Sequence, residues 1–214
     1  MTTLQAAAQA HVLVVRRGRR LELLTIGWNL VEAIVSVGAG VIAGSVSLVA
    51  FGFDSVIECA SAVILLWRLR EGADGEKRER QALRLVGVSF LLLAGYVGVD
   101  AIRRLVEGRH PETSVVGIVV AALSLAVMPL LARAKRGVAA ELRSEALRAD
   151  SRQTDLCAVL SAILLAGLVL NATVGWWWAD PVAALAMVPI IVREGLEGLR
   201  GRACGSCGGG ECER

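Results

Sequence analysis

Two acidic residues, Asp54 and Glu58, stand four positions apart in an apolar run of membrane-spanning length. In a helix this spacing places both side chains on one face, about one turn apart. Two carboxylates so placed repel each other unless a proton or a cation neutralises them, and the cost is highest at membrane depth. A shared proton and a bound divalent cation would compete for the same pair. The spacing therefore predicts a site that can exchange a metal ion for protons.

Three further polar residues fall in or at the edge of other apolar runs. Glu32 lies midway along the first run with Asn29 three positions before it, and Asp155 opens the fifth run. Asn29 and Glu32 share a helical face, so they could add oxygen ligands or accept protons, or they could form a buried polar contact between helices. The predicted spans contain Arg only near their ends, at Arg68 and Arg84, and no Lys or Arg is available at membrane depth to pair with these acids. Each acid therefore needs another partner, water or a bound cation.

The elements that must position these side chains are apolar runs long enough to cross a bilayer. Hydrophobic residues make up 55% of the 214-residue chain, and its mean hydropathy is +0.61, which is too apolar for one soluble domain. Six runs qualify by length and hydropathy: Leu23–Ala43, Leu48–Leu69, Leu83–Ile102, Val115–Ala132, Leu156–Val174 and Trp178–Val192.

This pattern predicts an all-α integral membrane protein with six transmembrane helices. Its parts are a cytoplasmic N-terminal arm (residues 1–22), a six-helix transmembrane domain (23–196) and a flexible Cys-rich cytoplasmic tail (197–214). Aromatic residues are only 4% of the chain while Ala, Val, Leu and Gly abound. We therefore expect helices that pack closely through small residues.

The basic residues predict the orientation of the six runs. With both termini inside, the inner segments hold all but three of the 23 Lys and Arg residues, including Lys135 and Arg136 after the fourth run. The outer loops hold only Arg103, Arg104 and Arg109. Because cytoplasmic loops are enriched in Lys and Arg, both termini are predicted to face the cytoplasm of a multi-pass protein of the inner cell membrane. Asp100, near the outer surface, is expected to pair with the neighbouring arginines.

Two segments resemble the cation diffusion facilitator family. Gly44–Leu48, followed by Asp54–Glu58, resembles that family's second helix. Leu147–Asp155 precedes the fifth run, and the Trp178-Ala179-Asp180-Pro181 sequence is similar to the family's Trp-x-Asp-Pro turn into helix six. The likeness extends over residues 20–200.

The resemblance implies a ligand set. In that family two ligands on helix two and two on helix five, each pair at four-residue spacing, form a tetrahedral metal site. By position, Asp54, Glu58 and Asp155 match three ligands, and Ser151 falls where zinc-handling members usually carry His. A hydroxyl is a poor zinc ligand, so Glu32 could complete the shell. Asp150 is left open as a ligand, an entry-side charge or a partner of Arg148 and Arg152.

The resemblance also implies an activity. We expect a secondary transporter that exports a divalent transition metal in exchange for protons, with zinc first and manganese, iron or cobalt as the other ions that such ligands accept. The metal is the substrate, and no permanently bound cofactor is expected. Most family members continue after helix six into a soluble dimerising domain, so a homodimer here would form through the membrane helices.

The chain ends in a thiol-rich segment. Cys204, Cys207 and Cys212 lie on a glycine-rich stretch, and in a reducing cytoplasm such thiolates can bind soft or borderline metals. The alternative is a disordered end with incidental cysteines. Cys59 and Cys157, each inside an apolar run, are predicted to be small apolar packing residues.

Two other functions stay open at this stage. A proton-coupled carrier of an organic cation would use Asp54, Glu58 and Asp155 to compensate charge without coordination. A non-transporting sensor would bind metal on its tail and be indifferent to those acids. An enzyme is disfavoured because no intramembrane His and no catalytic helix signature is present. A nucleic-acid partner is disfavoured because the basic residues cluster between apolar runs.

Overall fold

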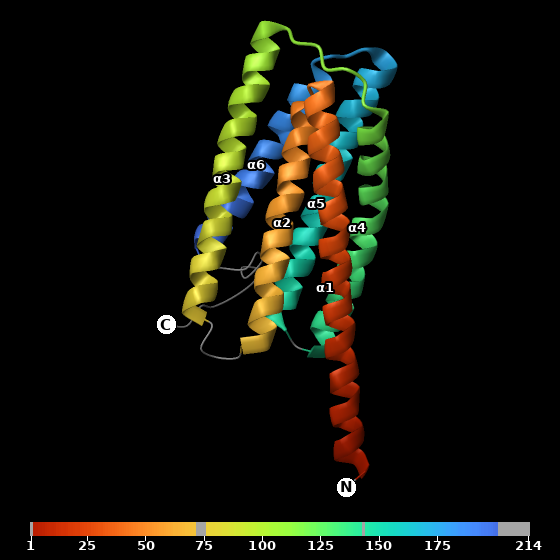
Figure 1. Cartoon of the computed structure of the whole chain (residues 1–214), viewed down its shortest axis with the longest axis vertical. Helices are drawn as coiled ribbons and strands as arrows, with labels where there is room; N and C mark the ends of the chain where they lie inside the picture. The colour runs from red at the N-terminus through yellow and green to blue at the C-terminus, as the bar shows by residue number, and fades with distance from the viewer. Residues whose placement is uncertain (1, 72–75, 143, 201–214) are drawn as a thin grey trace, which may run out of the picture.

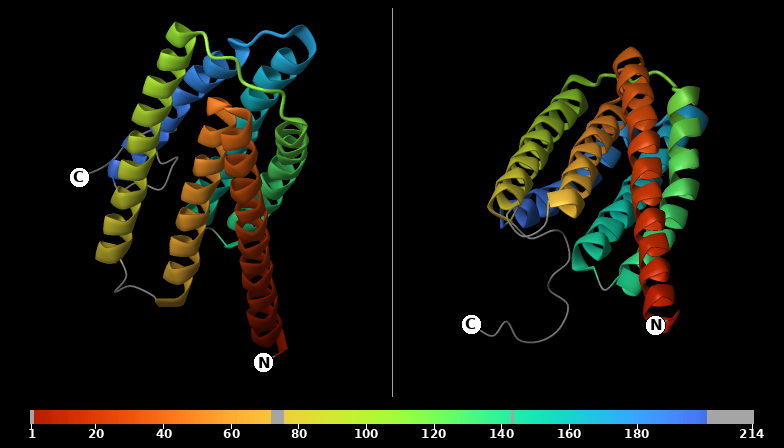
Figure 2. Two further views of the ribbon diagram at one scale, coloured as in Figure 1. Left: turned by 45° about the horizontal axis from the view of Figure 1, so that its top comes forward. Right: turned by 60° about the horizontal axis from the view of Figure 1, so that its bottom comes forward.

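The computed structural model describes residues 2–71, 76–142 and 144–200. In these residues the chain forms six helices and no strand: α1 (Thr2–Ala43), α2 (Val46–Glu71), α3 (Glu76–Glu107), α4 (Val115–Leu142), α5 (Glu145–Val174) and α6 (Ala179–Leu199). They run up and down in one elongated bundle, and α1 extends beyond it at the end where the chain begins (Figure 1). The views in Figure 2 show α3 beside α6 on one side of the bundle and α4 beside α1 on the other. The prediction of an all-helical fold is confirmed.

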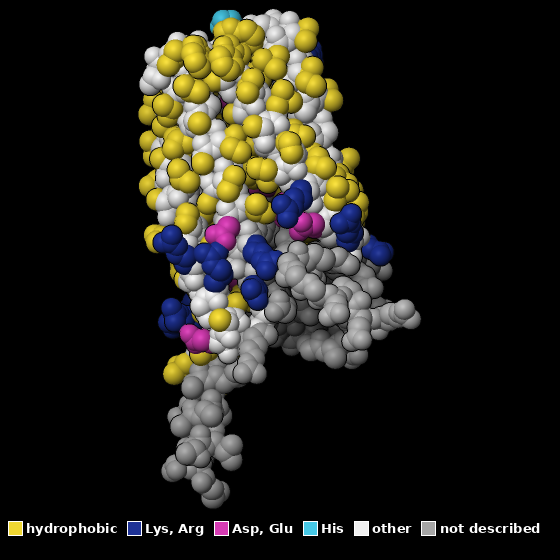
Figure 3. All heavy atoms as spheres, turned by 180° about the vertical axis from the view of Figure 1, so that it is seen from behind, with side chains coloured by type: hydrophobic (Ala, Val, Ile, Leu, Met, Phe, Trp, Pro, Cys, Tyr) yellow, Lys and Arg dark blue, Asp and Glu magenta, His cyan; other side chains and the backbone are white. Residues whose placement is uncertain are grey.

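The surface of the bundle is that of a membrane protein. Five segments of the described residues, in α1 to α5, are long and apolar enough to cross a bilayer. Apolar side chains point outward along them, as Leu92 and Val99 do on α3, each 70% exposed. In Figure 3 hydrophobic side chains cover most of the bundle, and Lys and Arg side chains gather toward the end where the chain begins. The sixth helix, α6, is not among these five segments, because it carries Asp180, Arg193 and Glu194. It packs against α3 and α5.

Several helices continue well past the predicted spans. Helix α1 begins at Thr2, so the predicted arm continues the first span as one helix. Helix α4 runs on to Leu142 and α5 begins at Glu145, where Ser144 caps it by accepting a hydrogen bond from the Leu147 amide. Lys135 and Asp150 consequently lie on helices and not in the connection between them.

The opposite end of the bundle is fixed by Asp180. This fully buried carboxylate at the start of α6 accepts hydrogen bonds from the Val46 amide (2.9 Å), the Ser45 hydroxyl (2.5 Å) and the Ser47 hydroxyl. A negative charge is favourable at the N-terminus of a helix, where backbone amides lack partners. Asp180 therefore ties the start of α2 to the start of α6. Within α3, Asp100 pairs with Arg104 (2.9 Å), as predicted.

Small residues let the helices approach closely, as expected. A Cβ atom added to Gly52 of α2 would lie 2.8 Å from the backbone nitrogen of Val37 in α1. A Cβ atom on Gly87 of α3 would lie 2.7 Å from the carbonyl oxygen of Gly195 in α6. Contacts this short are repulsive, so both positions require glycine. The close α1–α2 contact lies directly before Asp54 on α2.

Candidate metal centre

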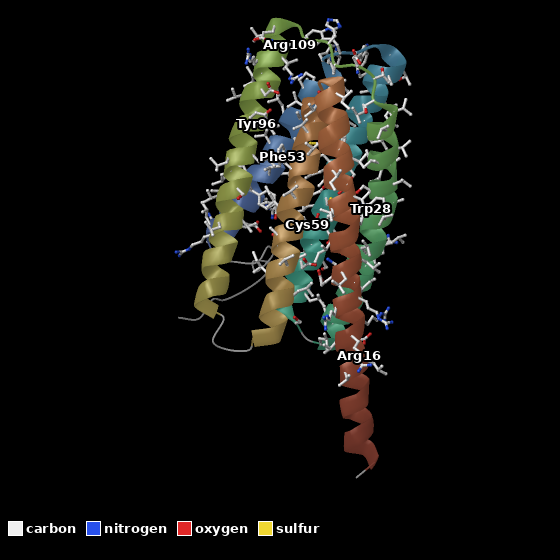
Figure 4. The ribbon with its side chains drawn as sticks, viewed as in Figure 1. Arg16, Trp28, Phe53, Cys59, Tyr96 and Arg109 are labelled. Atoms are coloured by element: carbon white, nitrogen blue, oxygen red, sulfur yellow. The ribbon has the colours of Figure 1, made fainter. Side chains whose placement is uncertain are left out.

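The acidic pair of α2 lies inside the bundle. Asp54 is 7% exposed and Glu58 is 3% exposed, and the two side chains share one face of α2, as predicted. Cys59, which follows Glu58, is labelled in Figure 4 at about the middle of the bundle, between Arg109 at one end and Arg16 toward the other. The pair is therefore buried at membrane depth.

Helix α5 completes this group with a thiol. The Sγ atom of Cys157 and a carboxylate oxygen from each of Asp54 and Glu58 all lie within 4.8 Å of one another. Cys157 is only 2% exposed. Cys157 packs in the apolar core, as predicted, and its sulfur in addition faces two carboxylates. These three side chains are called the α2–α5 cluster below.

A small cavity adjoins the cluster. It is lined by Asp54, Glu58 and Cys157, by Gln153 one turn before Cys157, and by Glu194 of α6. Gln153 and Cys157 are four residues apart on α5 and face Asp54 and Glu58, which are four residues apart on α2. Two helices thus present two polar side chains each, with the spacing that the family resemblance led us to expect on helices two and five.

One buried carboxylate oxygen of the cluster lacks a hydrogen-bond partner. Glu58 Oε2 makes no hydrogen bond, and in the described part of the chain no Lys or Arg forms an ion pair with Asp54 or Glu58. Glu58 Oε1 accepts a long hydrogen bond (3.4 Å) from Thr154. A buried carboxylate without a counter-charge is costly, so these groups must carry a proton or hold a cation.

Asp155 and Ser151 do not join the cluster. The carboxylate of Asp155 is 41% exposed and pairs with Arg136 of α4. It shares a helix face with Val159, which is 46% exposed, so this face points outward from the bundle. Ser151 is fully buried, but its hydroxyl donates to the carbonyl of Arg148 (2.7 Å) within the same helix.

Glu32 and Asn29 lie behind the cluster on α1. Glu32 is 1% exposed, accepts a hydrogen bond from the Ser55 hydroxyl of α2 (2.7 Å) and lies 3.9 Å from the Cys157 sulfur. Its Oε1 atom has no partner, and neither polar atom of the Asn29 amide has one. The first helix thus adds a carboxylate next to the cluster thiol, whereas Asn29 remains an unpaired buried amide.

A buried lysine overturns one expectation. Lys135 was counted among the inner loop residues, but it is fully buried on α4 and lies 3.2 Å from Glu22 of α1 and 2.5 Å from Asp150 of α5. A cation therefore lies inside the bundle, and it compensates a second acidic pair. Glu22, Lys135 and Asp150 are called the lysine triad below. The triad thus gives a partner to Asp150, whose role the sequence left open.

The cluster suits a cation of intermediate softness. Carboxylates and an amide oxygen favour harder ions, whereas a thiolate favours zinc and softer ions, and zinc binds both carboxylates and thiolates. Neither Gln153 nor Cys157 was predicted as a ligand from the sequence. One signal was available: Asp150, Thr154, Cys157 and Ser161 recur at helical spacing as one polar stripe on α5, and all four are buried.

Comparison with known proteins agrees with this geometry. The cation efflux transmembrane domain family matches residues 23–201. The uncharacterized transporter sll1263 of Synechocystis sp. is 30% identical over 183 residues, which cover 80% of this chain and 58% of that protein. The uncharacterized transporter MJ0449 of Methanocaldococcus jannaschii is 24% identical over 180 residues, 80% of this chain and 63% of that protein.

A vertebrate protein is also similar. Transmembrane protein 163 of Xenopus laevis is 29% identical over 177 residues, 81% of this chain and 63% of its own length. The chain thus spans about 58–63% of the length of these relatives. Since the family match covers most of the six-helix bundle, the chain belongs to the cation efflux family, the cation diffusion facilitators, and carries that family's transmembrane domain.

Proposed function

We propose that this chain is a secondary transporter that exports a divalent transition-metal cation from the cytoplasm in exchange for protons. The observation that carries the proposal is the α2–α5 cluster, two buried carboxylates and a thiol within 4.8 Å of one another. The small cavity beside it favours a bare ion over an organic cation, because a larger substrate would need a wider space.

We assign the ligands to Asp54, Glu58, Cys157 and Gln153, in place of the Asp155 and Ser151 pair that the family resemblance implied. The donor set favours zinc, with manganese, iron or cobalt as weaker substrates. Glu32 lies close enough to Cys157 to belong to the outer shell of the site.

The exchange of metal for protons would follow from the negative charge that the ligands carry when they are deprotonated. Metal entering from the cytoplasm would displace protons from the carboxylates and the thiol, and protons returning from the outside would release it. Alternating access would expose the site to one side at a time. The protein would lie in the inner cell membrane with both termini in the cytoplasm, which is supported by the basic end of the bundle in Figure 3.

Two further elements of the proposal lie outside the described contacts. A homodimer would form through the apolar outer faces of the membrane helices. The cysteines Cys204, Cys207 and Cys212, which lie outside the described residues, would capture metal in the cytoplasm and pass it to the site.

The test is metal uptake into proteoliposomes with an imposed pH gradient. Zinc, manganese, ferrous iron and cobalt would be compared for the wild type, the double variant Asp54→Ala/Glu58→Ala and the control Asp155→Ala. We expect gradient-dependent zinc uptake in the wild type and the control, and none in the double variant. Equal metal flux in all three proteins, or none in the wild type, would reject the proposal; uptake of an organic cation or a purely sensing role would then be tested.

A further inference from the structure

The lysine triad is linked to the α2–α5 cluster by one side chain. The Thr154 hydroxyl accepts a hydrogen bond from the Lys135 ammonium (3.4 Å) and is within 3.4 Å of Glu58 Oε1. Thr154 is fully buried, and so are Lys135 and Glu22. The ammonium is therefore separated from a proposed metal ligand by a single hydroxyl group.

The contacts of Thr154 cannot all be made at once. Its hydroxyl has one proton, yet two acceptors are within reach, Glu58 Oε1 and the Asp150 carbonyl (3.2 Å). Glu58 Oε2 has no partner. The network thus has two arrangements of similar geometry, one directed to α5 itself and one directed to the cluster.

The Lys135 side chain is long and flexible enough to adapt to either arrangement of the Thr154 hydroxyl. A lysine carries three donors on a flexible four-carbon stem, and here they serve Glu22, Asp150 and Thr154. Weakening one of its carboxylate partners would release the ammonium toward Thr154 and Glu58. An ammonium beside Glu58 would then compete with a divalent cation for the same carboxylate.

We propose that Lys135 is a positioning residue for the transport site, a tethered counter-cation that reaches Glu58 through Thr154 when cargo has left and that withdraws to Glu22 and Asp150 when cargo binds. The inference rests on the proposed function. It gives Glu58 an internal cation whenever neither a metal ion nor a proton occupies that carboxylate, which would otherwise face the membrane interior uncompensated.

The test is a double-mutant cycle on Cd²⁺ binding. The full chain is used with Cys204, Cys207 and Cys212 replaced by serine, and binding is followed by the ultraviolet absorption of the Cd²⁺–thiolate bond at Cys157. In this background Glu22→Gln should weaken Cd²⁺ binding by about tenfold, because it frees Lys135 toward Glu58. The same substitution in a Thr154→Val background should change binding by less than about twofold.

The control is Thr25→Val. Thr25 is also fully buried and lies near Glu22 on α1, but its hydroxyl donates only to its own helix, to the Leu21 carbonyl. Glu22→Gln should keep its full effect in that background. An unchanged effect of Glu22→Gln in the Thr154→Val background would show that Glu22 acts only through space and would overturn the inference. If the protein gives no Cd²⁺–thiolate absorption that is lost in Cys157→Ser, the proposed function itself is overturned.

Discussion

Two acidic groups in this bundle contain similar carboxylates but differ in what neutralises them. In the lysine triad, the protein supplies the cation, since Lys135 lies between Glu22 and Asp150. In the α2–α5 cluster, the third side chain is the Cys157 thiol, and Glu58 keeps an unpartnered oxygen. A carboxylate pair with a lysine contains its own counter-cation, whereas a pair that faces a thiol leaves the cation position open to a substrate. The difference can be tested by converting one group into the other.

The largest effect is expected when the cluster is given its own lysine. Cys157→Lys places an ammonium between Asp54 and Glu58, as Lys135 lies between Glu22 and Asp150. Zinc transport in proteoliposomes should fall by about 100-fold or more, because the substituted ammonium takes the place of the metal and one ligand is lost. The folded state should be retained, which is checked by gel filtration and thermal unfolding in detergent. Zinc transport within about tenfold of the wild type in a folded Cys157→Lys protein would contradict the assignment of the site.

The converse change removes the lysine from the triad. Lys135→Met leaves Glu22 and Asp150 buried without a counter-charge, so the free energy of unfolding should fall by about 3–5 kcal/mol. The triple variant Glu22→Gln/Lys135→Met/Asp150→Asn should lie within about 1 kcal/mol of the wild type, since no buried charge is then left alone. Chemical unfolding in detergent measures both. A triple variant as unstable as Lys135→Met would mean that packing, and not charge, holds this region.

A smaller effect should separate the metals. Cys157→Ser replaces a soft ligand by a hard one, so the affinity for cadmium should fall by about tenfold or more and that for manganese by less than about twofold. Equilibrium binding to the purified protein measures both. The matched control is Cys59→Ser, because this thiol donates to the Ile26 carbonyl (3.6 Å) and lies outside the cluster. Equal losses for both metals would argue against Cys157 as a ligand.

The smallest effect concerns the ion pair of Arg136 and Asp155. Both side chains are about two-fifths exposed, at 42% and 41%, so Asp155→Asn should change the free energy of unfolding by less than about 1 kcal/mol. Zinc transport should stay within about twofold of the wild type, and Arg136→Gln should behave in the same way. A loss of transport with Asp155→Asn alone would return Asp155 to the ligand set that the family resemblance implied.

The sequence by itself determined the architecture and half of the site. Apolar runs of bilayer length can satisfy their backbone only as helices, so the all-helical membrane fold follows from composition and length. The spacing of Asp54 and Glu58 on one helix is a local property, and it places both carboxylates together whatever surrounds them.

Only the tertiary structure decided which face of α5 contacts Asp54 and Glu58. Ser151 with Asp155 and Gln153 with Cys157 have the same four-residue spacing, but a shift of two residues turns a helix by about 200°. Sequence spacing cannot distinguish two opposite faces, whereas packing against α2 and α4 turns Cys157 inward and leaves Asp155 beside Arg136. The role of Lys135 was decided in the same way. Lys135 is buried because α1 and α5 both extend past the predicted spans and bring Glu22 and Asp150 to it. The local sequence around Lys135 does not show that these three residues are in contact.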